Sequence, residues 1–248
     1  MATITRPGEP EAPGTPRRRP WVLEIYRTGV GKKYAMAITG VLGMLYVVGH
    51  MVGNLKLYFG PSSAGVEAID HYGEWLRTIG SPALPHGGFL WIMRVLLGAA
   101  LLIHVHAAWS LTRMNKRANA PYASERDYIA ASWASRTMRW TGIIVLAFIA
   151  FHLTDLTWGS ANPDFVRGEV RHNMIESFDR VPVAIAYVVA NLALGVHLWH
   201  GAWSLFQSLG VNNPRFRQWR VWFAWGFAGA VVLGNISFPL AIVTGFVD

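Results

Sequence analysis

The sequence predicts an all-α membrane protein, built as a bundle of five transmembrane helices. Of its 248 residues, 52% are hydrophobic and only 15% are charged, whereas an ordinary soluble domain carries about 25% charged residues. Five segments stay apolar over the roughly 20 residues that a helix needs to cross the hydrocarbon core. Twelve Trp and twelve Phe agree with this class, because aromatic rings anchor helix ends at the lipid interface.

The chain is expected to begin with a tail and to continue as one domain. Residues 1–20 are rich in Pro, Gly and charge and have no apolar run, which predicts a disordered cytoplasmic tail and no signal peptide. Residues 21–30 form a short amphipathic stretch, expected at the membrane surface. Residues 21–248 form the membrane domain. Its spans are predicted near 34–57, 89–112, 138–157, 182–206 and 221–246, between connections rich in Gly, Pro and Asn.

The distribution of basic residues predicts the orientation. Of the 22 Lys and Arg residues, sixteen fall on the side of the membrane that holds the N-terminus and six on the other. The positive-inside rule therefore predicts that the N-terminus is cytoplasmic and that Asp248 lies outside. The net charge of +8 is then a topology signal. We expect an acidic partner surface at the cytoplasmic face and no nucleic acid.

The chain has no cysteine. Thiolate-ligated iron–sulfur clusters, covalent c-type haem attachment and disulfides within this chain are therefore excluded.

Four histidines lie inside four separate predicted spans: His50, His104, His152 and His197. A histidine inside a membrane is costly and is usually functional. At 1.5 Å per residue, His50 and His152 lie at matched depth toward the outer side, and His104 and His197 toward the inner side. Two facing neutral imidazoles are the axial ligands of a low-spin haem iron used in electron transfer. The pattern predicts two bis-imidazole haem sites; a single membrane histidine can also simply bridge two helices by hydrogen bonding.

Two further histidines leave the inner pair open. His106 and His200 each stand three residues before Trp-Ser-Leu, in two segments that resemble each other. Either could replace its neighbour, His104 or His197, as a ligand, or could hydrogen-bond a propionate, a quinone or another helix. The remaining histidines of the connections are expected to be solvated: His71, His86 and His172.

Five motifs follow one another along the chain. In order, they are Gly31-Lys32-Lys33-x-x-Met36-Ala37-x-Thr39-Gly40, His50-Met51-x-Gly53-Asn54-Leu55, Leu90-Trp91-x-x-Arg94, Phe151-His152-Leu153-x-Asp155-Leu156-Thr157 and His197-Leu198-x-His200-Gly201-x-Trp203-Ser204-x-Phe206-Gln207-x-Leu209-Gly210. Together they resemble the motifs of a known family, the dihaem cytochrome b membrane-anchor subunits of succinate dehydrogenases (succinate:menaquinone oxidoreductases) and fumarate reductases, of the single-anchor type with five spans. The resemblance covers roughly residues 27–245.

The resemblance implies a ligand set. It implies that His50 and His152 hold the outer (distal) haem b. It implies that His104 and His197 hold the inner (proximal) haem b. His197 is favoured over His200 because the ligand of relatives stands thirteen positions before a closing glycine, here Gly210.

The resemblance also implies partners and a location. Relatives bind a flavoprotein subunit with FAD and an iron–sulfur subunit at the cytoplasmic face, and they reduce menaquinone. In that arrangement this chain oxidises no succinate itself and carries electrons from the iron–sulfur subunit through two b haems to the quinone. A multi-pass protein of the bacterial cytoplasmic (inner) membrane, surrounded by lipid, is expected.

Two sets of polar residues are candidates near these haems, each with ordinary interfacial roles as the alternative. Possible propionate partners are Arg94 at the outer haem and Lys33 and Arg139 at the inner one. Asp155, three residues after a ligand, could also orient an imidazole or relay protons. The possible quinone site comprises Asn54, Lys56, Tyr58, Glu74 and Asp155.

Two other functions compete with this interpretation. A dihaem cytochrome b of a hydrogenase, formate dehydrogenase or b561-type reductase would share the paired histidines. A haem-free membrane transporter would not need them, and would commonly show internal repeats with broken helices.

Overall fold

The structure is a computed structural model that describes residues 20–62, 65–119, 128–211 and 213–247. Predictions for residues 1–19 lie outside this part of the chain. All regular elements in the described ranges are helical. They are α1 (Trp21–Arg27), α2 (Gly29–Asn54), the 3₁₀ turn η1 (Leu55–Tyr58), α3 (Ala68–Thr78), α4 (Gly88–Asn119), α5 (Tyr128–Leu156), α6 (Val170–Phe178), α7 (Val181–Ser208), the 3₁₀ turn η2 (Pro214–Phe216) and α8 (Arg217–Val243).

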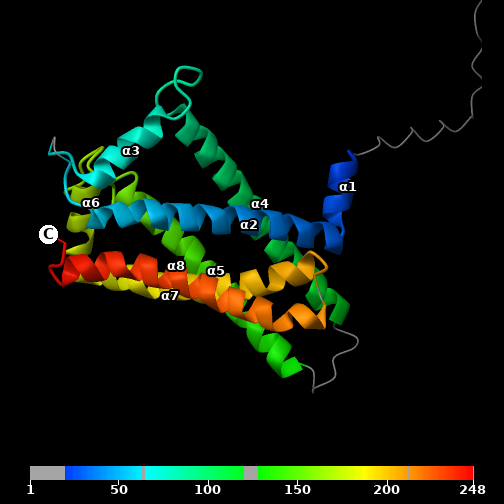
Figure 1. Ribbon diagram of the computed structural model, residues 1–248. Coiled ribbons are helices and arrows are strands. Elements are labelled where there is room, and N and C mark those ends of the chain that lie inside the picture. Colours follow the sequence, from blue (N-terminus) through cyan, green and yellow to red (C-terminus); the bar gives the residue numbers. More distant parts are fainter. Residues whose placement is uncertain (1–19, 63–64, 120–127, 212, 248) are drawn as a thin grey trace, which may run out of the picture.

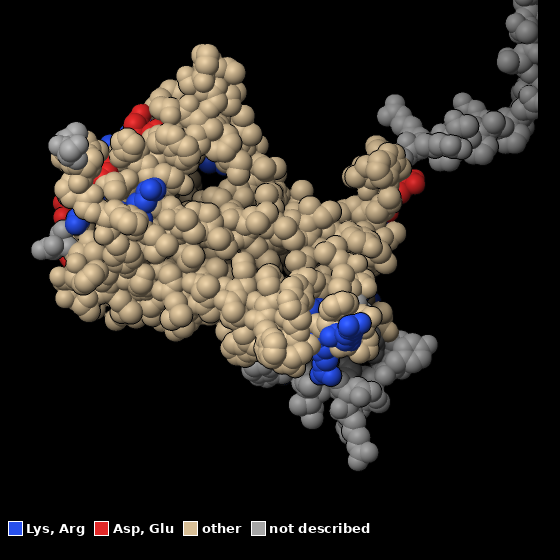
Figure 2. All heavy atoms as spheres, viewed as in Figure 1, with Lys and Arg blue, Asp and Glu red and all other residues tan. Residues whose placement is uncertain are grey.

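Five of these helical segments are long and apolar enough to cross a membrane, which confirms the predicted all-α multi-pass architecture. They cover Gly29–Tyr58, Gly88–Ala118, Arg136–Leu156, Val181–Ser208 and Pro214–Val243. In Figure 2 the charged side chains gather toward the two ends of the molecule, and the surface between them is made of other residues. Such an uncharged belt is what the hydrocarbon core of a bilayer requires.

The last span ends earlier than the sequence suggested. Helix α8 ends at Val243 instead of continuing to 246, and Gly245 follows with a φ of 71°. A residue in the left-handed region stops a helix by turning its next amides back onto the last carbonyls. Here the amide of Phe246 donates to the carbonyl of Ala241 at 2.8 Å.

The helices are arranged along one long axis, as Figure 1 shows. Helices α2, α7 and α8 run roughly alongside this axis, whereas α4 and α5 cross it obliquely. Helix α1 lies at one end of the bundle, and α3, α6 and the C-terminus lie at the other. We call these the α1 end and the α3–α6 end. Most inter-helix contacts are made between α7 and α8, α2 and α4, and α5 and α7.

The spans differ strongly in the fraction of their residues that is buried inside the protein. In the most apolar stretches of α7 and α8, 33% and 28% of residues are buried inside the protein, against 6% in α2 and α4 and none in α5. Small residues allow α7 and α8 to approach closely, and a Cβ on Gly195 of α7 would overlap the side chain of Val232 of α8. In α2, α4 and α5 most apolar side chains are half-buried or exposed instead.

A tight turn connects α1 to α2. Thr28 caps α2, because its hydroxyl accepts a hydrogen bond from the amide of Gly31 at 2.9 Å. A Cβ on Gly31 would overlap the carbonyl of Ile25, so only glycine fits. The ammonium of Lys32, although the residue is buried, donates to the carbonyl of Arg27 at 3.0 Å. This turn fixes α1 across the end of the bundle.

Candidate functional site

The four membrane histidines meet in two facing pairs. His50 of α2 and His152 of α5 have ring centroids 5.7 Å apart, and His104 of α4 and His197 of α7 have centroids 6.4 Å apart. An imidazole nitrogen binds a metal at about 2 Å, so two rings on opposite sides of one metal atom have centroids about 6 Å apart. We call these the α2–α5 pair and the α4–α7 pair. Each has the spacing to hold one metal atom between its rings.

In the α4–α7 pair, a threonine hydroxyl lies next to Nδ1 of each ring. The Oγ1 of Thr39 donates to the carbonyl of Ala35 at 2.7 Å and lies 3.0 Å from Nδ1 of His104. Because the hydroxyl proton is already used, Thr39 must accept from an Nδ1–H group. His104 then carries its proton on Nδ1, and the lone pair of Nε2 is left for a metal.

The second ring of this pair has an equivalent environment. The Oγ1 of Thr141 donates to the carbonyl of Thr137 at 2.7 Å and lies 3.5 Å from Nδ1 of His197. A Cβ on the following Gly142 would lie 3.4 Å from the ring of His197, and one on Gly40 would lie 3.6 Å from the ring of His104. A Thr-Gly dipeptide therefore places each ring.

These contacts reveal an internal repeat that is longer than the short His106/His200 segment. Thr39-Gly40 stands eleven residues before His50, and Thr141-Gly142 stands eleven residues before His152. The two units are α2–α3–α4 and α5–α6–α7, each a long helix, a short helix and a second long helix. Each histidine pair takes one ring from each unit, so the pairs lie where the two units face each other.

The α2–α5 pair has different partners. Nδ2 of Asn54 donates to Nδ1 of His50 at 2.9 Å, one helical turn away. The hydroxyl of Tyr187 in α7 lies 3.3 Å from Nδ1 of His152 and donates to Oδ2 of Asp155 at 2.9 Å. Tyr187 therefore accepts from His152, and the hydrogen-bond chain ends on a carboxylate.

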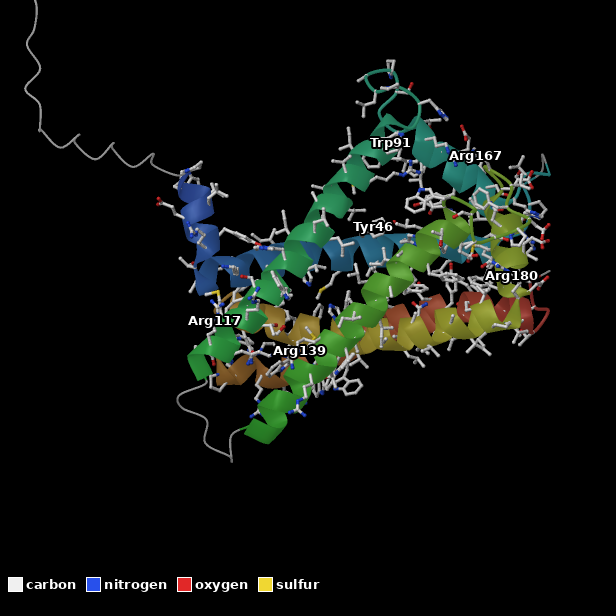
Figure 3. All side chains as sticks on the ribbon, turned by 180° about the vertical axis from the view of Figure 1, so that it is seen from behind. Tyr46, Trp91, Arg117, Arg139, Arg167 and Arg180 are labelled. Carbon is white, nitrogen blue, oxygen red and sulfur yellow. The ribbon has the colours of Figure 1, made fainter. Side chains whose placement is uncertain are left out.

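Asp155 is fully buried and is held by two further donors. Ser177 of α6 donates to Oδ2 at 2.5 Å, and Nη2 of Arg180 donates to Oδ1 at 2.6 Å. Arg180, labelled in Figure 3, comes from the short connection between α6 and α7. A buried charge is tolerated only with such pairing, so this cluster fixes α5, α6 and α7 to one another at the α3–α6 end.

His106 and His200 face other groups. Nδ1 of His106 lies 2.6 Å from the hydroxyl of Tyr26 in α1, and the two rings stack with centroids 5.8 Å apart. Nε2 of His200 lies 3.3 Å from the hydroxyl of Thr137, and its ring packs on Trp199. Among the described ring contacts, imidazole meets imidazole in the α2–α5 and α4–α7 pairs.

The predicted propionate partners lie at both ends of the molecule. The guanidinium of Arg94 lies 5.0 Å from the ring centroid of Trp91 on the same helix, and Figure 3 shows that ring on the upper part of α4. Lys33 and Arg139 are exposed. Both belong to the half of their helix toward the α1 end, where Figure 3 labels Arg139.

The residues of the predicted quinone site have separate neighbours. Lys56 lies over the ring of Tyr72, and Tyr58 donates to Ser237 of α8 at 2.8 Å. Exposed Glu74 contacts Arg77 and His86, and the hydrogen bond from His86 lowers the pKa of Glu74. Asn54 and Asp155 belong to the surroundings of the α2–α5 pair, as described above.

Five residues that hydrogen-bond to this site were not predicted as part of it: Thr39, Thr141, Ser177, Arg180 and Tyr187. Thr141 could have been found by comparing the spacing from each Thr-Gly dipeptide to the next histidine. Ser177, Arg180 and Tyr187 lie 22, 25 and 32 residues from Asp155 along the chain. No local pattern in the sequence connects them.

The protein offers two ligands to each candidate metal atom. Among the described residues, no group of three or more His, Asp or Glu side chains gathers as a metal site. No protein-family model, curated protein or solved structure matched this chain.

Proposed function

We propose that this chain is the dihaem cytochrome b membrane-anchor subunit of a succinate dehydrogenase, which passes electrons from an iron–sulfur subunit through two b haems to menaquinone. The observation that carries the proposal is that four imidazoles face each other in two pairs, which lie at different depths of one membrane bundle. The choice of succinate dehydrogenase rests on the motifs of the sequence that resemble that family.

The residues present fit haem better than a bare metal ion. Each pair of imidazoles would hold one haem iron, and the porphyrin would complete the coordination of that iron. The Nδ1 atoms of His104, His152 and His197 face hydroxyl groups whose own protons are used elsewhere, which favours the Nε2 lone pair as ligand. The open apolar surfaces of α2, α4 and α5 suit a flat apolar macrocycle. Without cysteine, the haems would be b-type.

Haem iron with two imidazole ligands supplies one-electron transfer. The chain's own residues hold the rings: Thr39 and Thr141 in the α4–α7 pair, and Asn54 and Tyr187 in the α2–α5 pair. In this proposal the α1 end is cytoplasmic, since the excess of basic residues lies there. The α4–α7 pair is then the inner one, closer to the soluble flavoprotein and iron–sulfur partners.

A visible spectrum of the purified complex tests the proposal. Dithionite should give a b-type reduced spectrum with about two haems per chain, and succinate should reduce the same haems in the intact complex. Haem that dithionite reduces but succinate does not, with other soluble subunits copurifying, would select another dihaem cytochrome b. A colourless protein would instead select the transporter.

A further inference from the structure

The hydrogen-bond chain that starts at His152 has a fixed direction. The hydroxyl of Tyr187 donates to Oδ2 of Asp155 at 2.9 Å, so its oxygen accepts the Nδ1 proton of His152 at 3.3 Å. The chain therefore runs from imidazole to phenol to carboxylate. This direction is fixed because a phenol has only one proton to donate. Since Tyr187 donates that proton to Asp155, its oxygen can only accept from His152.

The carboxylate at the end of this chain is held in place. Asp155 has no exposed surface, and it also accepts from Ser177 at 2.5 Å and from Arg180 at 2.6 Å. Arg180 is itself fixed, because Nη1 donates to the carbonyl of Ala161 at 2.8 Å. A carboxylate that accepts from three donors is held in one orientation and cannot rotate away from Tyr187.

The other rings have neutral partners. Thr39 and Thr141 pass their protons to backbone carbonyls, of Ala35 and Thr137, and His50 faces the amide of Asn54. Among the hydrogen bonds described for the four paired rings, the chain from His152 is the one that reaches a charge. The two pairs are therefore chemically unequal although their ligands are the same.

We infer that Tyr187 and Asp155 are positioning residues that act through His152 and lower the reduction potential of the haem held by the α2–α5 pair. An imidazole that donates toward a carboxylate is a stronger electron donor, and a stronger donor stabilises oxidised iron. The inference rests on the proposed function, because it needs haem between His50 and His152. It does not depend on which soluble partners bind.

Redox titration of the intact complex carrying Tyr187→Phe tests the inference. The variant keeps the ring and removes the hydroxyl. We expect the reduction equilibrium of one haem to shift about tenfold toward the reduced form, an upward shift of about 59 mV for one electron, while the second haem is unchanged. Asp155→Asn should shift the same haem in the same direction.

Two further variants make the outcome decisive. Thr154→Val, next to Asp155, removes a hydroxyl that donates only to the carbonyl of Phe151 and should move neither potential. Ser177→Ala removes a competing donor from Oδ2 of Asp155, so the bond from Tyr187 strengthens and the potential should fall.

The same set separates failure of the inference from failure of the proposed function. Both haems bound with unchanged potentials in Tyr187→Phe would overturn the inference alone. If that variant does not fold, a raised or unchanged potential in Ser177→Ala overturns it equally. Wild-type protein without haem would overturn the proposed function itself.

Discussion

The two histidine pairs differ in the residues that contact the Nδ1 atoms of their rings. Behind the α4–α7 pair, two equivalent Thr-Gly dipeptides approach the rings, and their hydroxyls end on backbone carbonyls. Behind the α2–α5 pair, one ring faces an amide and the other faces a phenol that donates to a buried carboxylate, which is paired with half-buried Arg180. Both units thus supply the same histidines, but the residues that contact Nδ1 are alike only in the α4–α7 pair.

The two pairs are therefore connected differently to the rest of the protein. Equivalent neutral partners make the α4–α7 pair symmetric between the two units. The α2–α5 pair is joined to α6 and to the connection before α7 through Asp155. In the proposed function this pair lies on the outer side, where electrons leave for the quinone. The predictions below test whether the two pairs are separate sites and how far their supports differ.

Removing one ligand should have the largest effect. We expect His152→Ala or His50→Ala to lower the haem content from about two per chain to about one, and His104→Ala or His197→Ala to remove the other haem. Pyridine haemochrome assays with the reduced spectrum measure which haem is lost. His71→Ala, on exposed α3, is the control and should keep both.

Variants of the two neighbouring histidines test whether the ligands of the α4–α7 pair are correctly assigned. His106→Ala and His200→Ala should both retain two haems, because their rings face Tyr26 and Thr137. Loss of a haem in either variant, with retention in His104→Ala or His197→Ala, would mean that the ligands of the α4–α7 pair are wrongly assigned.

The fold was largely predictable from the sequence, because a membrane imposes length and apolarity on every span. All five predicted spans overlap helices of the structure. The errors lie at helix ends: Gly245, in the left-handed region, ends α8 at Val243, and η2 starts the last segment at Pro214. Such ends depend on local turn geometry, which hydropathy does not measure.

The site was only partly predictable. The four histidines stood out because imidazole inside an apolar span is costly, and matched depth predicted how they pair. The residues that orient these rings could not be predicted, because only the packing of the helices brings them to the rings. Tyr187 is an ordinary aromatic residue of an apolar helix until α7 places its hydroxyl between His152 and Asp155. Arg180 contributed only to the charge count, since its partner lies 25 residues earlier.

Breaking the ion pair behind the α2–α5 pair should cost stability. Arg180→Gln leaves the carboxylate of fully buried Asp155 without its cation, and we expect a loss of about 3 kcal/mol in the free energy of unfolding. Thermal or denaturant unfolding followed by circular dichroism measures it. Asp155→Asn combined with Arg180→Gln should recover part of this loss, because no charge is then left buried alone.

A surface ion pair at the same end provides the matched comparison. Arg77 contacts exposed Glu74 at 3.5 Å, and water already solvates both groups. Arg77→Gln should therefore leave the unfolding transition unchanged. Equal losses for Arg77→Gln and Arg180→Gln would contradict the structural role of the Asp155 cluster.

The threonines of the α4–α7 pair should have a smaller effect than Tyr187, since their chains end on neutral carbonyls. Thr39→Val and Thr141→Val remove the acceptor of an Nδ1 proton. We expect a rise in the potential of one haem that stays below a tenfold change in its reduction equilibrium. Redox titration measures this rise. As controls, Thr39→Ser and Thr141→Ser keep the hydroxyl and should retain the wild-type potential. A shift of the haem of the α2–α5 pair instead would contradict the assignment.

The smallest effect concerns pH at the exposed side of the α3–α6 end. The hydrogen bond from His86 lowers the pKa of Glu74 below its usual 4.5. Folding therefore favours the ionised carboxylate. The stabilisation by this pair is present above pH 4.5 and is lost as the pH falls through the lowered pKa. Because Glu74 is exposed, we expect only a slight difference in unfolding midpoint between wild type and His86→Ala at pH 6, and none at acid pH where Glu74 is protonated. A difference that grows on acidification would show that Glu74 is not the group that titrates.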